Sequence, residues 1–253
     1  MSLLERIDHP QDLHGLTDEE LQQVAQEVRE HIIDTVGEIG GHFGANLGAC
    51  EIAVALHSIL DSPRDKILWD VGHQAYPHKI LTGRRDQLHT IRKYRGLAPF
   101  CSIAESEHDI MGAGHASTAI GYAVGLKEAM RRGHGEDGNV VAVVGDGAMT
   151  GGVAFEAVHQ AGGEGTPIVV VLNDNGMSIA PNVGALSRHL NRKHPVEPAV
   201  HDLNGQAAQP VRIRHLRHQR MEGCRDRRKV CEGRGVVEPG DVAEGSAVAH
   251  AGQ

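Results

Sequence analysis

The sequence predicts an α/β protein with an open, mostly parallel sheet flanked by helices. Two runs of apolar, mainly β-branched residues, 139–147 and 167–175, have the character of parallel strands that are buried on both faces. Between them, residues 152–163 show a helical pattern of the length that a crossover connection needs. A strand, a helix and a strand at this spacing predict a right-handed βαβ unit.

The N-terminal region is predicted to be helical. Thr17 is followed three residues later by Glu20, which is the pattern of a capping box, and hydrophobic residues then recur at helical spacing as far as Ile32. The glycine pair at 40–41 is expected to end this helix. Residues 47–60 predict a second helix that is more deeply buried.

Two further elements are expected before the βαβ unit. Residues Ile67–Val71 predict a short strand, and the loop after it carries Gly72 and His73. Residues 114–132 predict a helix rich in small side chains, which allow close packing against a sheet.

Composition places the chain among ordinary globular proteins. It has 253 residues, of which 40% are hydrophobic and 23% charged, and a net charge of −8 argues against nucleic-acid binding. No apolar run approaches the ~20 residues of a membrane span, and no secretory signal is recognisable, so we expect a cytoplasmic protein. The spacing of the cysteines argues against a zinc site or a disulfide framework; they are Cys50, Cys101, Cys224 and Cys231.

The character of the chain changes near residue 193. Large apolar residues become sparse in the last segment, and no Phe, Tyr or Trp follows Phe155. Basic residues in this segment are interspersed with acidic ones, which disfavours a nucleic-acid-binding tail. We therefore expect residues 1–193 to form the ordered domain and residues 194–253 a disordered tail. A frameshift near codon 193 is one explanation for the abrupt change.

An acidic residue occupies the glycine-rich turn that follows the first of the two apolar runs. Gly145, Gly147 and Gly151 form a GxGxxxG pattern of the kind that admits phosphate, and Asp146 lies inside it. A carboxylate within ~4 Å of a diphosphate costs several kcal/mol unless a cation lies between them. Mg²⁺ suits this position because it prefers oxygen ligands and accepts phosphate oxygens among them.

A second oxygen ligand is expected at the end of the next strand. Asn175 follows the GDG triplet after 27 intervening residues, at the carboxyl end of the second apolar run. Taken singly, Asp146 could cap the following helix and Asn175 could turn a loop. Together, at this spacing, the two residues favour a shared cation.

Four longer segments carry a resemblance to a known family. The GDG-x27-N pattern resembles the thiamine-diphosphate motif of transketolase-like enzymes. The wider match is to the N-terminal part of the 1-deoxy-D-xylulose-5-phosphate synthase family, and it runs almost continuously over residues 8–192. The segments that carry it are "GGHFGANLGACEIAVALH", "ILWDVGHQAYPHKILTGR", "AESEHDIMGAGHAST" and "LNDNGMSIAPNVGALSRHLNR".

The resemblance implies a thiamine-diphosphate-binding fold, of which this chain carries the diphosphate domain. It implies that the carboxylate of Asp146, the side-chain oxygen of Asn175 and the backbone carbonyl of Met177 bind Mg²⁺, with Asn175 also counted among the cofactor contacts. Gly147 and Ala148 would contact the diphosphate through their backbone.

The remaining site residues are also implied by the resemblance. His73 would line the cofactor, together with Gly114, His115 and Ala116. His42 would face the thiazolium carbon and serve in proton transfer, a role for which an imidazole is suited because its pKa lies near working pH.

The activity that the resemblance implies is the condensation of pyruvate with glyceraldehyde 3-phosphate with loss of CO₂, the first step of non-mevalonate isoprenoid synthesis, which also feeds thiamine synthesis. Family members form homodimers and are more than twice as long as this chain, and a later domain supplies the glutamate that activates the cofactor. We therefore expect this chain alone to be inactive. Two alternatives are a non-catalytic cofactor-binding fragment and a half-subunit of a split transketolase-like enzyme.

Overall fold

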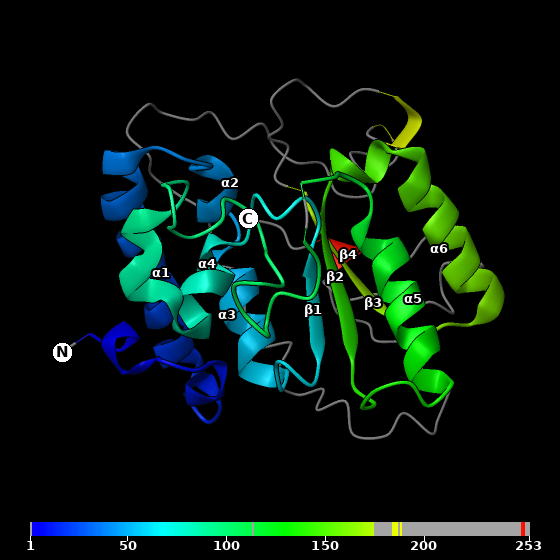
Figure 1. Ribbon diagram of the computed structural model, residues 1–253, viewed down its shortest axis with the longest axis horizontal. Helices are drawn as coiled ribbons and strands as arrows, with labels where there is room; N and C mark the ends of the chain where they lie inside the picture. Colours follow the sequence, from blue (N-terminus) through cyan, green and yellow to red (C-terminus); the bar gives the residue numbers. More distant parts are fainter. Residues whose placement is uncertain (1, 113, 175–183, 187, 189–248, 251–253) are drawn as a thin grey trace.

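The computed structural model describes residues 2–112, 114–174, 184–186, 188 and 249–250 of the chain. Figure 1 shows a central sheet with helices on both sides of it. The strands follow the order β1-β2-β3-β4, and every neighbouring pair is parallel. The predicted α/β class is thus confirmed. The strands are β1 (Lys66–Trp69), β2 (Val140–Gly145), β3 (Val169–Asn173) and β4 (Ala249–His250).

The predicted βαβ unit consists of β2, β3 and the helix α6 (Gly152–Glu164) between them. Val141 pairs with Val169 at one end of the ladder, and Gly145 pairs with Asn173 at the other. This register places the ends of the two strands side by side. The glycine turn after β2 therefore lies next to the end of β3.

Alternate side chains of the strands enter two separate hydrophobic cores, one on each face of the sheet. Val141 and Val143 belong to the core that includes α1 (Asp18–Ile39) and α3 (Cys50–Ile59). Val140, Ala142 and Val144 belong to the other core, with α6 and α5 (Ala119–Arg131). Helices cover both faces of the sheet. These strands therefore have continuous apolar sequences and not alternating ones.

Helix α1 begins and ends as the sequence predicts. The Thr17 hydroxyl accepts a hydrogen bond from the Glu20 amide at 3.2 Å, and the Glu20 carboxylate accepts one from the Thr17 amide at 2.7 Å. The helix ends before Gly40, whose φ of 75° suits a residue without a side chain. Its buried face consists of Leu21, Val24, Ala25, Val28, Ile32 and Val36.

Short helical segments connect the longer elements. Helix α3 is buried along most of its length, and Cys50 is a core residue within it. The remaining short helices are α2 (Gly44–Leu47) and α4 (Tyr76–Lys79), the 3₁₀ helices Leu4–Arg6, Pro10–Leu13, Arg85–Thr90 and Ala148–Thr150, and the π-helical turn Ile80–Arg84.

Several predicted boundaries are wrong. The helix expected over residues 114–132 begins only at Ala119, and the helix expected over residues 47–60 begins at Cys50. The strand expected over Ile67–Val71 ends at Trp69 in the structure. Val71 has a φ of 61°, in the left-handed region that β-branched residues rarely adopt, and Gly72 follows with a φ of 87°. The chain therefore turns out of the sheet two residues earlier than its apolar pattern indicates.

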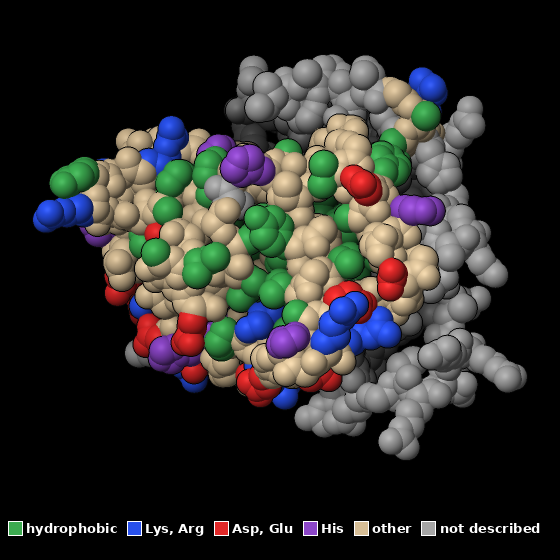
Figure 2. Space-filling model, turned by 45° about the vertical axis from the view of Figure 1, so that its right-hand side comes forward, with side chains coloured by type: hydrophobic (Ala, Val, Ile, Leu, Met, Phe, Trp, Pro, Cys, Tyr) green, Lys and Arg blue, Asp and Glu red, His purple; other side chains and the backbone are tan. Residues whose placement is uncertain are grey.

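Some large hydrophobic side chains remain at the surface. Figure 2 shows hydrophobic side chains reaching the surface across the middle of one face, with charged side chains mostly toward its lower edge. On α5 and α6, Tyr122, Val153 and Phe155 are about half exposed.

None of the helices in the described part of the chain combines the length and apolar character that a membrane crossing requires.

Most of the segment beyond residue 193 lies outside the described residues. Its described part, Ala249–His250, pairs with Val171 and Leu172 of β3 at the edge of the sheet. The predicted boundary near residue 193 and the predicted disorder of residues 194–253 stay predictions.

We predict that Thr17→Ala lowers the free energy of unfolding by about 1 kcal/mol, because one amide at the start of α1 loses its acceptor. Urea unfolding monitored by circular dichroism measures this change. Thr17→Ser, which keeps the hydroxyl, is the matched control and should stay close to the unchanged chain. Equal losses in both variants would contradict the capping role.

Candidate functional site

Three polar residues lie at the carboxyl ends of neighbouring strands. Asp70 follows β1, Asp146 follows β2, and Asn173 is the last residue of β3. All three are buried, and the Asp146 amide donates a hydrogen bond to the Asn173 carbonyl at 3.2 Å. This edge is where open parallel sheets bind their ligands.

Asp70 joins β1 to the loop before α5. One of its carboxylate oxygens accepts a hydrogen bond from the Ser117 amide at 2.8 Å, and the other accepts one from the Ala119 amide at 3.0 Å. The Ser117 hydroxyl in turn donates to the Ala148 carbonyl at 2.6 Å. Asp70 therefore holds the loop that carries Gly114 and His115, and Ser117 connects that loop to the glycine turn after β2.

Sequence patterns did not point to Asp70 or Ser117. The available signal was an acidic side chain near the carboxyl end of the predicted strand, where it can accept hydrogen bonds from the start of a helix. Ser117 has a φ of 72°, a strained conformation for a residue with a side chain. It lies close to Gly151, where an added Cβ would come within 2.1 Å of the Ser117 hydroxyl oxygen.

The glycine turn carries Asp146, which is buried, directly before two partly exposed residues. Only 8% of Asp146 is exposed, whereas Gly147 and Ala148 are half-buried. Helix α6 begins a few residues later, with no side-chain cap and no acidic residue in its first turn. Its N-terminus is therefore suited to an anion. The other two predicted Mg²⁺ ligands, Asn175 and Met177, lie outside the described residues.

The predicted residues His42 and His73 lie close together, with ring centroids 6.1 Å apart. The buried side chain of Asn46 holds the backbone of both. Its amide nitrogen donates to the carbonyl of His42 at 2.5 Å and to that of His73 at 2.7 Å. Its oxygen accepts from the Tyr76 amide at 2.8 Å. Sequence patterns did not identify Asn46, because an isolated asparagine does not reveal its partners.

Aromatic side chains surround His42. Its ring lies 5.4 Å from that of Phe100 and 6.3 Å from that of Tyr76, measured between centroids. The Tyr76 hydroxyl lies 3.5 Å from Nδ1 of His42 and accepts a hydrogen bond from the His42 amide at 3.3 Å. Burial and the nearby positive charge of Arg92 lower the pKa of His42. Its imidazole is therefore neutral near pH 7 and able to accept a proton.

The predicted residues around Gly114 form an exposed edge of the site. Gly114, His115 and Ala116 are all exposed. Gly114 has a φ of 143°, and a Cβ on it would contact the Phe100 ring at 3.6 Å. Phe100 therefore lies close to both Gly114 and His42, and no sequence pattern pointed to it.

Two buried polar atoms of this region have no hydrogen-bond partner among the described residues. They are Nδ1 of His73 and the side-chain oxygen of Asn173. The amide nitrogen of Asn173 lies 3.3 Å from the side-chain oxygen of Gln74, so Asn173 adjoins the loop that carries His73. Buried polar atoms are almost always hydrogen-bonded in native proteins. These two atoms fit a site whose polar partner is a ligand.

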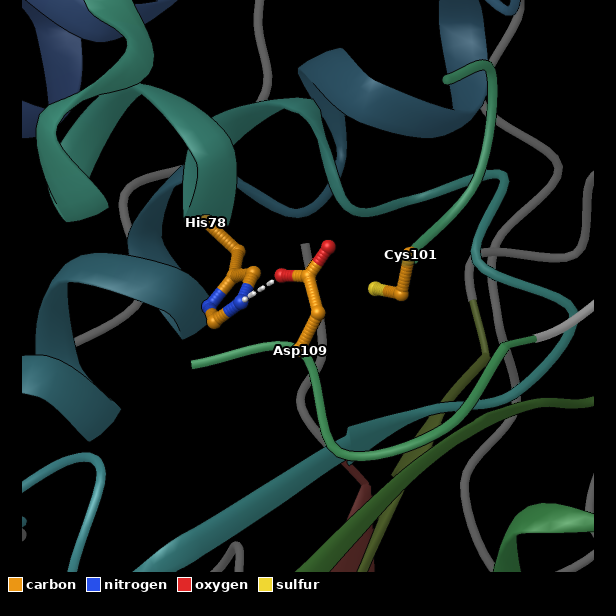
Figure 3. A group of neighbouring side chains, drawn as sticks. All are labelled: His78, Cys101 and Asp109. Carbon is orange, nitrogen blue, oxygen red and sulfur yellow. Dashed lines mark hydrogen bonds and ion pairs between the residues drawn. The ribbon is translucent and has the colours of Figure 1, made fainter. Parts of the chain in front are cut away.

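A separate cluster has the composition of a metal centre but not its electrostatics. The ligand atoms of His78, Cys101 and Asp109 lie within 4.8 Å of one another (Figure 3). Both Asp109 oxygens already accept hydrogen bonds from the Arg84 guanidinium, at 2.8 and 2.9 Å, and burial raises the pKa of the Cys101 thiol to about 12. A cation would have to displace one positive charge and deprotonate a thiol. We interpret the cluster as part of an ion-pair network.

Solved structures with a similar arrangement of the chain are transketolases. The transketolase from Campylobacter jejuni superposes with a TM-score of 0.56 at 23% identity, over 65% of this chain and 29% of that one. The transketolase from Leishmania mexicana gives 0.55 at 22% identity, over 63% of this chain and 28% of that one. Fold and site together define the class: this chain has the transketolase-like α/β fold.

Sequence comparison identifies the family. Residues 4–236 match the family model described as 1-deoxy-D-xylulose-5-phosphate synthase. The enzyme of that name from Thermomicrobium roseum is 51% identical over 230 residues, which are 88% of this chain and 36% of the relative. The one from Anaeromyxobacter sp. strain K is 59% identical over 191 residues, or 76% of this chain and 30% of the relative.

The chain therefore belongs to the 1-deoxy-D-xylulose-5-phosphate synthase family, as the sequence resemblance predicts. It spans 36% and 30% of the length of these two relatives. The matched range runs past residue 193 and does not itself place a domain boundary.

We predict that Gly151→Ala destabilises the protein by about 1 to 3 kcal/mol, because its Cβ overlaps the side chain of Ser117. Adding Ser117→Gly removes the overlapping atoms and suits the positive φ at that position, so the double variant should regain part of the loss. Urea unfolding of both single variants and the double variant measures this. An additive loss would show that the overlap is not the cause.

We predict that the imidazole of His42 titrates below the ordinary histidine range, and that Arg92→Gln raises its pKa. The reason is that removing a nearby positive charge makes protonation easier. NMR titration of ¹³C-labelled histidine measures both values, with His42 assigned from the signal missing in His42→Gln. Lys93→Gln, at the neighbouring exposed position, is the control. A His42 pKa that falls in Arg92→Gln would contradict the assignment.

Proposed function

We propose that the protein to which this chain belongs binds thiamine diphosphate and Mg²⁺ at the carboxyl edge of the sheet and condenses pyruvate with glyceraldehyde 3-phosphate with loss of CO₂. The observation that carries the proposal is the buried carboxylate of Asp146 in a glycine turn at the end of β2. Membership of the 1-deoxy-D-xylulose-5-phosphate synthase family supports the reaction and its substrates.

The chemistry of the available donors fits a Mg²⁺–diphosphate group. Asp146 provides a carboxylate oxygen, and the hard cation that it would bind is one that also accepts phosphate oxygens. The half-buried backbone of Gly147 and Ala148 and the uncapped N-terminus of α6 lie beside it in the chain and offer N–H groups to an anion. Asn175 and Met177 are proposed to complete the protein ligands.

His42 is proposed to move a proton within this site. Burial keeps its imidazole neutral, and Tyr76 and Phe100 limit the orientations that its ring can take. His73 lies beside His42. Burial and the neighbouring His42 lower the pKa of His73 as well. Two neutral imidazoles near the cofactor can accept or donate protons without adding positive charge to the resting site.

The bound cofactor would supply an electron sink for the decarboxylation of pyruvate. The contribution of the protein residues is to hold the diphosphate, to limit water around His42 and to carry protons. Gly114, His115 and Ala116 are proposed to line the cofactor at the exposed edge of the site. The homodimer and the cytoplasmic location expected from the sequence stay predictions.

The test of this proposal is calorimetric titration of the full chain with thiamine diphosphate, with and without Mg²⁺. We expect binding that requires Mg²⁺, and we expect Asp146→Ala to abolish it because the cation loses its carboxylate ligand. Asp137→Ala is the control, since Asp137 lies in an exposed ion pair with Lys127. Circular dichroism checks that each variant is folded. Unchanged binding by Asp146→Ala, or equal binding without Mg²⁺, would overturn the assignment of Asp146.

A further inference from the structure

Four charged side chains form a buried network outside the proposed cofactor site. They are Lys79, Arg84, Glu105 and Asp109, here called the buried ion-pair network. Arg84 donates to both oxygens of Asp109, at 2.8 and 2.9 Å, and to Glu105 at 2.7 Å. Lys79 contacts Glu105 and lies 3.8 Å from Asp109. Two positive and two negative charges therefore balance in the interior.

Asp109 and Arg84 stay charged in this network. Hydrogen bonds from His78 and Arg84 hold the pKa of Asp109 well below its usual range, against the effect of burial. The carboxylates of Asp109 and Glu105 raise the pKa of Arg84, against the effect of burial. Replacing a buried ion pair by apolar residues is often neutral or stabilising, so stability alone is a weak reason for such a network. Its geometry suggests another role.

Each carboxylate of the network also binds the backbone of one short segment. Glu105 accepts a hydrogen bond from the Ala98 amide at 2.6 Å, and Asp109 accepts one from the Ser102 amide at 2.7 Å. The two amides are four residues apart, and Phe100 lies midway between them. The guanidinium of Arg84 spans both carboxylates. Arg84, with Lys79 beside it, therefore links the two carboxylates that hold the ends of the segment that carries Phe100.

This segment contacts the loops of the proposed site. A Cβ added to Gly72 would come within 3.0 Å of both the Phe100 Cβ and the Cys101 amide, so the loop before His73 packs directly on it. The Phe100 ring lies 5.4 Å from that of His42 and adjoins Gly114. A displacement of Phe100 would therefore change the surroundings of the histidines.

We propose that Arg84 and Glu105 are positioning residues, which hold Phe100 against His42 through the segment from Ala98 to Ser102. Neither residue touches a reacting group. The inference rests on the proposed function only in the role that it gives to His42. The position of Phe100 itself can be measured without cofactor or substrate.

The experiment is a double-mutant cycle that is read from the ring C–H signals of His42 in the full chain with ¹³C-labelled histidine. Phe100→Leu removes the ring current that Phe100 exerts on these signals and should shift them. Glu105→Gln keeps an acceptor for Ala98 but loses the charge that Arg84 binds, and should shift them by moving Phe100. In the Phe100→Leu background, Glu105→Gln should cause no further shift, because the ring that it moves is absent.

Glu128→Gln is the matched control, because Glu128 forms a surface ion pair with Arg131 and lies outside the network. It should leave the His42 signals unchanged. If Glu105→Gln does not fold, Arg84→Lys takes its place in the cycle, since lysine keeps the charge but loses the fork that joins the two carboxylates.

Two results would overturn the proposal. One is a folded Glu105→Gln variant whose His42 signals are unshifted, and the other is a shift of equal size with and without Phe100. The readout also separates this proposal from the proposed function. If Asp146→Ala keeps cofactor binding while the cycle behaves as expected, the positioning role stands and the cofactor assignment fails.

Discussion

The organisation of the site depends on the hydrogen bonds that the Asp70 carboxylate accepts from Ser117 and Ala119. Asp70 follows β1, so these bonds connect the sheet to the start of α5. Ser117 extends the connection to the Ala148 carbonyl in the turn after β2. The buried carboxylate of Asp70 thus helps to connect the loop before α5 with the glycine turn after β2, although the two are distant in the sequence. Asp70 already occupies the N-terminus of α5, so of the helices α5 and α6 it is α6, with its uncapped N-terminus, that suits an external anion.

Burial of the sheet on both faces places polar groups at its carboxyl edge. Every residue of β2 is buried, and its side chains pack alternately into two cores. Polar groups in such a strand would lose their hydrogen bonds to water without compensation. They occur instead where the strands end, as Asp70, Asp146 and Asn173 do. The same constraint that makes the strands apolar therefore concentrates the polar residues of the site.

The molecule uses buried charge and buried neutral groups for different purposes. In the buried ion-pair network, Arg84 and Asp109 remain charged because each is surrounded by opposite charge. His42 and His73 have no carboxylate among the hydrogen bonds described for them, and burial lowers the pKa of both. Charged pairs fix geometry, whereas neutral imidazoles remain available for proton transfer. Phe100 is the contact through which one region acts on the other.

The sequence by itself determined the α/β class, the capping box of α1, the βαβ unit and the family. Each depends on local periodicity, on a short motif or on long continuous similarity. It also placed Asp146, His42 and His73 among the candidate site residues, and their roles stay predictions. The proximity of His42 to His73, and the contacts of Asn46 and Phe100, were decided by the tertiary structure alone. Asn46 binds the carbonyl of His73, 27 residues away, and the Phe100 ring adjoins that of His42. Contacts between distant segments follow from how loops pack at the end of a sheet, and neither hydrophobic periodicity nor residue spacing encodes that packing.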